Sequence, residues 1–195
     1  RSRLSSLDAK LRESETRDEE NKVVIENLGS RLNAALASQV DELQRYRSEF
    51  FGRMRELLSC RSGIRFVGDR FVFQSEVLFA SGSATLGAAG KLALAKLGQV
   101  IREISAEIPQ ELNWLLRIDG HTDDVAIGPN SPFDNNWDLS TSRARSVVEY
   151  LITNERIPPD RLAAAGFGEF HPLVQGSDAQ SRSRNRRIEF KLTER

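Results

Sequence analysis

Apolar residues recur along the chain with two different periods, and the change of period divides the sequence into two parts. Over residues 1–62 they return every three or four positions, which is the spacing of one face of an α-helix. From Ile64 onwards, short runs of β-branched and aromatic residues alternate with longer amphipathic segments, as in a domain of mixed strands and helices. We therefore predict a helical stalk over 1–62 and a folded domain over 63–195.

The apolar stripe of the predicted stalk is long but interrupted. It lapses over the very polar stretch 14–22 and resumes at Ile25. Its members are Leu4, Leu7, Leu11, Ile25, Leu28, Leu32, Leu36, Val40, Leu43, Phe50, Met54 and Leu57. Two interpretations remain open: a solvated helix that folds back on its own domain, or a parallel coiled coil that joins two copies of the chain. We expect the coiled-coil homodimer, because a helix this long has more apolar surface than one small domain covers.

The order of the predicted elements beyond the stalk defines the fold class. Gly63 marks the end of the stalk helix, since glycine is the usual residue past a helix end. The expected strands are a tight hairpin or a bulged strand around Gly68-Asp69 and single strands at 114–120, 161–165 and 188–192. The expected helices cover 87–108 and 138–154, and the polar stretch 176–184 leads into the last strand. Strands that alternate with two substantial helices predict an α+β sandwich, with the helices on one face of a mixed sheet.

The most distinctive polar residues lie where one predicted strand ends and the next helix begins. His121 and Asp123 follow an apolar run and share one side of an extended chain, because side chains alternate along a strand. Asn136 or Asp138 can cap the following helix, in whose first turns Arg143 lies. Across one cleft, Asp123 would suit the ammonium of a zwitterion and Arg143 its carboxylate. On the residues alone, a salt bridge or two solvated charges explains the pair at least as well.

Composition narrows the classes of partner. Lys and Arg number 28 and Asp and Glu number 28, so the net charge of zero gives no reason to expect a nucleic acid partner. Cys60 is the single cysteine and excludes an intrachain disulfide. No run of apolar residues is long enough to span a bilayer. Because the first residue is arginine rather than methionine, we expect a fragment or processed form with an upstream segment outside this sequence.

Motifs of catalysis are missing from the sequence. It contains no G-x-S-x-G elbow, no phosphate-binding glycine loop and no pair of carboxylates with an evident catalytic role. His121, Asp123, Asp124 and His171 fit no zinc-binding spacing, because a third nitrogen or sulfur ligand is missing. We therefore predict a protein without enzymatic activity, metal or cofactor.

The segment 136–151, N-W-D-L-S-T-S-R-A-R-S-V-V-E-Y-L, resembles a family signature at every specified position. The signature is N-x2-L-S-x2-R-A-x2-V-x3-L of the OmpA-like (OmpA/MotB/Pal) peptidoglycan-binding domains. Further segments resemble the family in its order: 77–86, 120–123, 161–169 and 185–189. The resemblance covers roughly residues 64–195, is strongest to MotB-like stator proteins, and implies a β-α-β-α-β core.

The resemblance also implies a set of ligand-binding residues. Asp123 and Arg143 correspond to the residues that bind the diaminopimelate of the peptidoglycan stem peptide. The other implied ligand-binding residues are Ser81, Gly82, Thr122, Asn136, Leu139, Ser140, Asn185 and Arg187. Leu139 is better explained by packing, and Ser140 by a polar contact at the helix start. Asn185 and Arg187 are equally well explained by a charged entry to the last strand. Ser81 and Gly82 would offer backbone N–H groups to a carboxylate.

The function implied by the resemblance is non-catalytic attachment to peptidoglycan in the periplasm of a Gram-negative bacterium. A missing upstream segment would anchor the protein in the inner membrane and pair it with a MotA/TolQ-like partner. Two alternatives stay open: a cell-wall hydrolase that uses His121 and Asp123, and a structural dimerisation module. The long loop 125–135 either covers the pocket or meets a partner.

Overall fold

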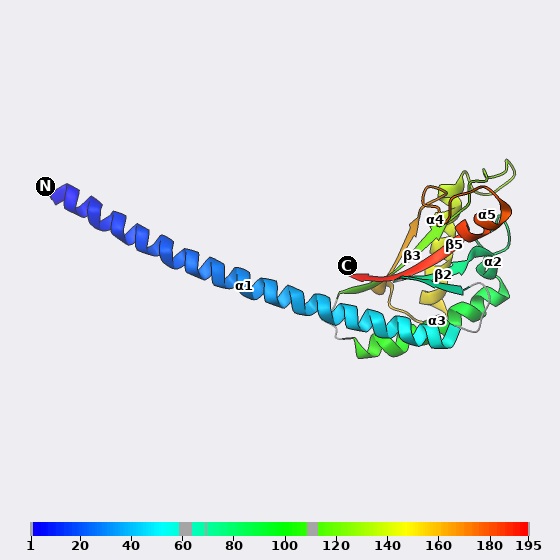
Figure 1. The fold of residues 1–195 in the computed structure, drawn as a ribbon, viewed down its shortest axis with the longest axis horizontal. Helices are drawn as coiled ribbons and strands as arrows, with labels where there is room; N and C mark the ends of the chain where they lie inside the picture. Colours follow the sequence, from blue (N-terminus) through cyan, green and yellow to red (C-terminus); the bar gives the residue numbers. More distant parts are fainter. Residues whose placement is uncertain (1, 59–63, 69, 109–112, 195) are drawn as a thin grey trace. The chain divides into compact units, whose positions relative to one another are not determined.

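The computed structural model describes residues 2–58, 64–68, 70–108 and 113–194, and the chain falls into two compact units. The first unit covers Arg1–Glu42 and the second covers Leu43–Arg195. Helix α1 (Ser2–Leu58) supplies the whole of the first unit and the beginning of the second (Figure 1). The predicted long N-terminal helix is therefore confirmed, while its predicted end at 61–63 lies outside the described residues.

Within the first unit, the apolar side chains of helix α1 that the structure describes are exposed to solvent. It contains no proline, and its two glycines lie far apart, so nothing in the sequence interrupts helical hydrogen bonding. The exposed apolar residues keep 45–67% of their surface in solvent: Leu7, Leu11, Val23, Val24, Ile25, Leu28, Leu32, Leu36 and Val40. A row of exposed apolar side chains of this kind is typical of an association surface.

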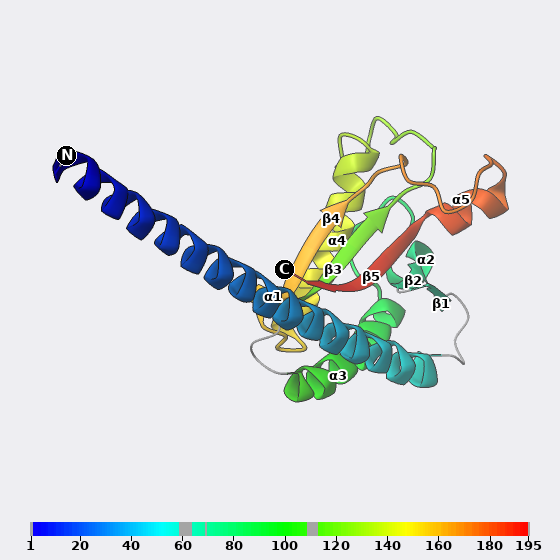
Figure 2. The ribbon, with the colours of Figure 1, turned by 60° about the vertical axis from the view of Figure 1, so that its left-hand side comes forward.

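The second unit is built on one mixed sheet of five strands in the order β1-β2-β5-β3-β4 (Figure 2). The strands are β1 (Ile64–Val67), β2 (Arg70–Gln74), β3 (Trp114–His121), β4 (Leu162–Gly166) and β5 (Arg187–Glu194). Strands β1 and β2 form the predicted hairpin, whose turn residue Gly68 has a φ of 58°, a conformation that glycine adopts without strain. Among the strands that the structure describes, only β3 and β4 pair in parallel. The predicted α+β class with a mixed sheet is confirmed.

Helices α3 (Ala88–Glu107) and α4 (Asn136–Thr153) cover one face of this sheet (Figures 1 and 2). Their buried residues join those of the strands in a single core, which includes Phe71, Phe73, Leu94, Leu97, Leu116, Ile118, Val147, Leu151, Ile188 and Phe190. Helix α4 approaches the sheet very closely: a Cβ on Gly120 would lie 2.1 Å from the carbonyl oxygen of Ser140. The end of β3 and the start of α4 are thereby fixed against each other.

Three local details differ from the sequence-based expectation. Helix α4 begins at Asn136, and its cap is Asn135, whose side chain accepts from the backbone N–H of Asp138 at 2.9 Å. The prediction of Asn136 or Asp138 as the cap was wrong, because the helix starts earlier. Two short helices, α2 (Ser75–Leu78) and α5 (Ala179–Asn185), were not predicted. Helices of four and seven residues are too short for apolar periodicity to mark them.

The core of the second unit reaches into the segment predicted as stalk. Tyr46, on the part of α1 that belongs to this unit, is partly buried against the core. The division predicted at residues 62 and 63 stays a prediction, since the side chains of Phe50, Met54 and Leu57 lie outside the described ones.

Candidate functional site

A cavity of about 580 Å³ opens at the carboxyl end of β3. Its walls come from α2 and the turn that follows it, from the residues after β3, from the loop after Asp123, from the first two turns of α4, and from Arg186. Of the ten predicted ligand-binding residues, the structure brings seven to this cavity: Ser81, Gly82, Thr122, Asp123, Asn136, Leu139 and Arg143. The long loop also lines it, with Val125 to Gly128 and Ser131.

Asp123 lies in the wall of the cavity, and both oxygens of its carboxylate already accept hydrogen bonds. One oxygen accepts from the backbone N–H of Val125 at 3.2 Å, and the other accepts from Nη1 of Arg186 at 2.6 Å. Arg186 also donates through Nε to Glu76 at 2.6 Å. Burial opposes the charge of Arg186, but its hydrogen bonds to Asp123 and Glu76 outweigh that effect and raise its pKa. The three side chains form a row of alternating charge along one wall.

Arg143 faces the same cavity without a carboxylate partner. The residue is only 3% exposed, its Nε donates to the carbonyl oxygen of Ser83 at 2.8 Å, and its guanidinium lies 5.4 Å from the ring centroid of Phe79. Burial lowers the pKa of Arg143. No hydrogen bond to a described residue uses its two terminal nitrogens. A buried cation without an ionic partner is costly, and this arrangement can accept an anionic group.

Two further polar atoms of the cavity wall are buried and unpaired among the described residues. They are Oγ1 of Thr122 and Oδ1 of Asn136. The amide of Asn136 donates to the carbonyl oxygens of Val125 at 2.9 Å and Asp123 at 3.4 Å, and so ties the loop to the helix start. Buried polar atoms normally have partners, and those without one commonly bind a ligand or water.

The remaining three predicted ligand residues do not line the cavity, and each makes internal contacts. The hydroxyl of Ser140 accepts from the N–H of Gly168 at 3.0 Å. This hydrogen bond lies where α4 closely approaches the sheet. Asn185 accepts from the N–H groups of Leu173 and Val174 at 2.9 and 3.0 Å. These contacts give Ser140 and Asn185 a structural role, and their ligand role rests on the resemblance alone.

Arg187 points to the face of the sheet away from the helices. Its Nε donates to Glu189 at 2.6 Å, and both residues are nearly inaccessible, at 3% and 1% exposure. Burial lowers the pKa of Arg187, whereas the pKa of Glu189 is lowered by Arg187 and Arg70 against the opposing effect of burial. The residue that lines the cavity is instead Arg186, which lies between α5 and β5. The sequence placed Arg186 in a basic cluster but did not distinguish it from Arg187.

His121 lies on that same far face and does not share a site with Asp123. Strand β3 ends at His121, so strand alternation does not extend to Asp123, and the prediction of a common side was wrong. The imidazole is 4% exposed and stacks on Phe167 with ring centroids 5.0 Å apart. Burial, reinforced by Arg187, lowers the pKa of His121 to about 3. A neutral, covered imidazole outside the cavity cannot act with Asp123 on a bound ligand.

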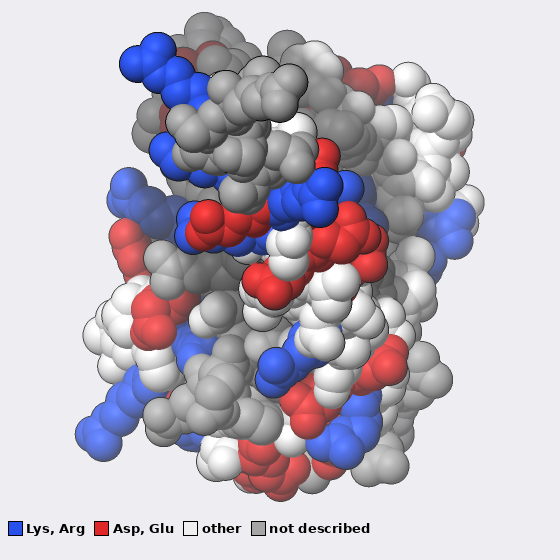
Figure 3. All heavy atoms as spheres, turned by 90° about the vertical axis from the view of Figure 1, so that its left-hand side faces the viewer, with Lys and Arg blue, Asp and Glu red and all other residues white. Residues whose placement is uncertain are grey.

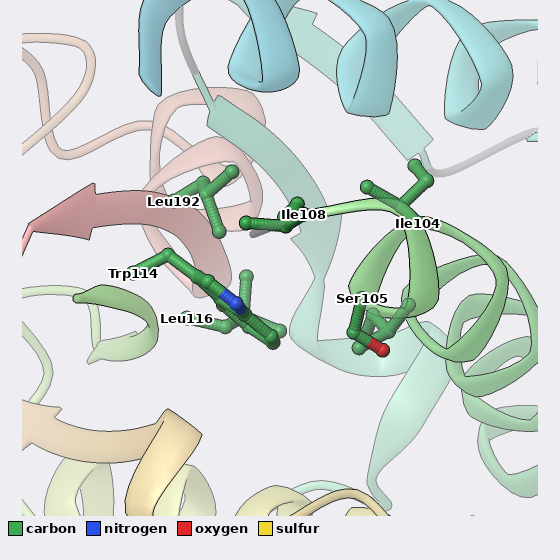
Figure 4. A pocket seen from close by; sticks show the side chains of 7 residues that line it. Ile104, Ser105, Ile108, Trp114, Leu116 and Leu192 are labelled. Atoms are coloured by element: carbon green, nitrogen blue, oxygen red, sulfur yellow. The ribbon is translucent and has the colours of Figure 1, made fainter. Parts of the chain in front are cut away.

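Two further cavities in the described part of the chain contain none of the predicted ligand-binding residues; the larger, of about 280 Å³, is lined by residues that include Arg102, Arg156 and Arg161. A small cavity of about 10 Å³ near the end of α3 is lined mostly by apolar side chains and is at most large enough for one water molecule (Figure 4). Within the described residues, no group of three or more His, Cys, Asp or Glu could hold a metal ion, and no helix is long and apolar enough to cross a membrane. On the face shown in Figure 3, charges of both signs are interspersed among the described residues.

The sheet order, the two covering helices and the cavity at the β3–α4 junction define an OmpA-like domain. A model of the OmpA family matches residues 78–186, which is more than half of the chain. The chain therefore belongs to the OmpA family, and the predicted resemblance is confirmed.

Within the family, the similar proteins include motility proteins. Motility protein B of Bacillus subtilis is 35% identical over 103 residues, which cover 49% of this chain and 39% of that protein. Outer membrane protein A of Bordetella avium is 31% identical over 123 residues, which cover 63% of this chain and 57% of that protein. A crystal structure of a MotB-like protein from Desulfovibrio vulgaris is 30% identical, with a TM-score of 0.68 over 80% of this chain and 99% of that chain. The chain spans about half the length of the curated relatives that it matches.

Proposed function

We propose that the second unit binds the stem peptide of peptidoglycan through its diaminopimelate residue and so attaches the protein to the cell wall. The observation that carries the proposal is the buried, ionically unpaired Arg143 in the same cavity as the carboxylates of Asp123 and Glu76. A cavity with a cation on one wall and carboxylates on another complements a group that bears both an ammonium and a carboxylate.

The proposed binding mode follows from the hydrogen-bonding capacity left at each residue. The terminal nitrogens of Arg143 would hold the ligand carboxylate side by side, in the paired geometry that guanidinium favours. The ammonium would approach Asp123, whose oxygens can accept more bonds than the two observed. Arg186 would then remain paired with Glu76. The unpaired atoms of Thr122 and Asn136 would receive the polar atoms of the peptide backbone.

The proposed role is attachment without catalysis. A hydrolase that uses His121 and Asp123 is not supported, because these two side chains lie on different sides of the sheet end. A purely structural dimerisation module would not require a buried arginine aimed into a cavity of about 580 Å³.

At the level of the cell, we propose that the domain lies in the periplasm. The similarity to motility protein B supports an inner-membrane protein that works with a MotA/TolQ-like partner and is held in place by the wall.

The test is co-sedimentation with purified sacculi at fixed ionic strength. We expect Asp123→Ala and Arg143→Ala each to weaken binding by at least roughly tenfold, since each removes a charge-assisted contact worth about 1.5–3 kcal/mol. Arg145→Ala is the matched control: it lies on the same helix, its side chain is 72% exposed, and it pairs only with Glu149 at 3.0 Å among the described residues. Circular dichroism checks that all variants are folded.

Two outcomes would contradict the proposal. Unchanged binding of sacculi by both Asp123→Ala and Arg143→Ala would show that the cavity is not the peptidoglycan-binding site. Equal binding to walls with diaminopimelate and walls with lysine at that position would contradict the role of Arg143, because lysine lacks the second carboxylate.

A further inference from the structure

Two large aromatic side chains lie exposed beside each other next to the cavity. Trp137 is 52% exposed and Phe170 is 62% exposed, and their ring centroids lie 5.7 Å apart at an angle of 46°. They are the aromatic members of the exposed large hydrophobic residues in the described part of the chain. Exposed aromatic surface of this size is commonly a binding surface.

The pair is held by well-ordered backbone contacts. Trp137 lies in the first turn of α4, and its carbonyl oxygen accepts from the hydroxyls of Ser140 at 2.9 Å and Thr141 at 2.8 Å. Phe170 follows a tight turn in which Gly168 has a φ of 53°, a conformation that favours glycine. The N–H of Gly168 donates to the hydroxyl of Ser140 at 3.0 Å. Ser140 thus ties together the two backbone segments that carry the rings.

The residues that carry the pair are close along the backbone to residues of the cavity wall. Asn136, which lines the cavity, directly precedes Trp137, and consecutive Cα atoms are about 3.8 Å apart. Thr122, which also lines the cavity, donates its backbone N–H to the carbonyl oxygen of Gly168 at 3.0 Å. Phe170 lies two residues beyond that contact. The backbone positions that carry the two rings therefore adjoin residues that line the proposed peptide site.

We propose that Trp137 and Phe170 form a platform for an amino-sugar ring of the wall polymer, next to the peptide bound in the cavity. The inference rests on the proposed function. A pyranose ring has an apolar face of C–H groups and a polar rim of hydroxyls, so it can lie on an indole while its rim stays hydrated. A stem peptide carries its diaminopimelate three residues from the sugar, a span of at most about 10 Å.

The surroundings of the pair favour a neutral polar ligand over a lipid surface. Thr141 and Glu169 are accessible beside it, and Asp138 lies one residue after Trp137. Carboxylates would repel an anionic membrane surface, whereas they accept hydrogen bonds from sugar hydroxyls. The platform would contribute affinity and orient the glycan strand relative to the peptide pocket.

The experiment compares two soluble ligands on the full chain by calorimetry: a disaccharide-peptide that contains diaminopimelate, and the same peptide without sugar. We expect the wild type to bind the disaccharide-peptide roughly tenfold more tightly. Trp137→Ala should remove this difference and leave the affinity for the free peptide unchanged. Trp137→Phe should retain most of the difference in affinity between the two ligands. Leu92→Ala, at an exposed apolar position on α3, should retain all of this difference.

A second readout uses the fluorescence of the same ring. The chain has two tryptophans, and Trp114 is only 5% exposed, so quenching by acrylamide reports mainly on Trp137. The disaccharide-peptide should protect the indole from acrylamide, and the free peptide should not.

The possible results separate this inference from the proposed function. Equal wild-type affinity for the two ligands would overturn the platform and leave the peptide site intact. An equal loss of affinity for both ligands in Trp137→Ala would also overturn the platform, because the aromatic pair would then only stabilise the structure of the cavity. Failure of the wild type to bind either ligand would overturn the proposed function and the platform together.

Discussion

Among single residues, Arg187 of β5 and Arg143 of α4 show how one side-chain type serves different purposes. Arg187 is buried but paired with Glu189, which itself also accepts from Arg70 at 2.8 Å. Arg143 is equally buried, yet its charge faces a cavity without an ionic partner. Breaking a buried ion pair costs stability, whereas a buried unpaired charge already carries its cost in the free protein. We therefore expect Arg187 to matter chiefly for folding and Arg143 for binding.

His121 gives a prediction of pH dependence. The unfolded chain binds a proton at this residue near the ordinary pKa of 6.5, but the folded chain does so only near a pKa of about 3. Between these values the unfolded state holds more protons, so the free energy of unfolding falls as the pH falls from 6.5 towards 3. The imidazole lies against Phe167, with Glu189 at 3.8 Å and Arg187, His171 and Arg70 as the other charged or titratable neighbours.

The measurement is urea denaturation at pH 7 and pH 5. The free energy of unfolding of the wild type should fall by about 2 kcal/mol from pH 7 to pH 5, and that of His121→Gln should fall much less. A pH of 5 lies above the ordinary carboxyl range, so the depressed pKa of Glu189 adds little in this window. The exposed His171, the other histidine of the chain, supplies the control His171→Gln, which should behave as the wild type. An identical pH dependence for His121→Gln would contradict the assignment.

At the scale of elements, α4 connects the core to the cavity. Ala144, Val147 and Leu151 face the core, while Leu139 and Arg143 reach the cavity. The position of this helix is set by its close approach to Gly120 on β3. Its N-terminal cap at Asn135 therefore supports both the fold and the site.

Removal of the Asn135 cap should weaken both the fold and the site. We expect Asn135→Ala to reduce the free energy of unfolding by about 1 kcal/mol, since the N–H of Asp138 loses its partner. Asn135→Ser, which can accept the same hydrogen bond, should restore most of that stability. Thermal or urea denaturation compares the three proteins. Equal losses in the Ala and Ser variants would show that the side chain stabilises the loop rather than the helix start.

For the whole molecule, the exposed stripe of the first unit supports our proposal that two copies of the chain associate in a parallel coiled coil. Leu28, Leu32 and Leu36 are 49–60% exposed on a helix without a described covering partner. Two joined copies would present two wall-binding sites to a polymer with many stem peptides. The second site would then bind at a high effective concentration, without any new contact.

We expect light scattering to give twice the monomer mass of 21.9 kDa for residues 1–195 and the monomer mass for residues 43–195. Replacement of both Leu32 and Leu36 by Glu should mimic the truncation, because it places charges in the apolar stripe. Ser30→Glu, which adds a charge on the same helix outside the stripe, is the control. The shorter chain should bind a soluble monovalent stem peptide normally but sacculi more weakly. A dimeric 43–195 would place the association surface in the second unit.

The predicted division at residues 62 and 63 is tested by a further truncation. A chain of residues 64–195 should fold and bind, but it lacks Tyr46, which packs on the core. We expect it to be less stable than 43–195 by about 1–2 kcal/mol, as for the loss of one partly buried aromatic side chain. Failure of 64–195 to fold would place the boundary of the domain within α1.

The sequence by itself determined the long helix, the mixed sheet with two covering helices, and the family. These features depend on the period of apolar residues and on a signature in consecutive positions, both of which are local. The same local information suggested Asp123 and Arg143 as candidates, because their residue types lie at a strand end and a helix start.

Only the tertiary structure decided which side chains meet. It assigned Arg186 rather than Arg143 as the ionic partner of Asp123, added Glu76 and Phe79 to the cavity, and separated His121 from it. It also brought Phe170 to Trp137. Each of these outcomes depends on strand register and on the close packing of α4, which are set by contacts between residues far apart in the sequence. A pattern read along the chain does not contain that information, because a shift of one residue in a strand moves a side chain to the opposite face.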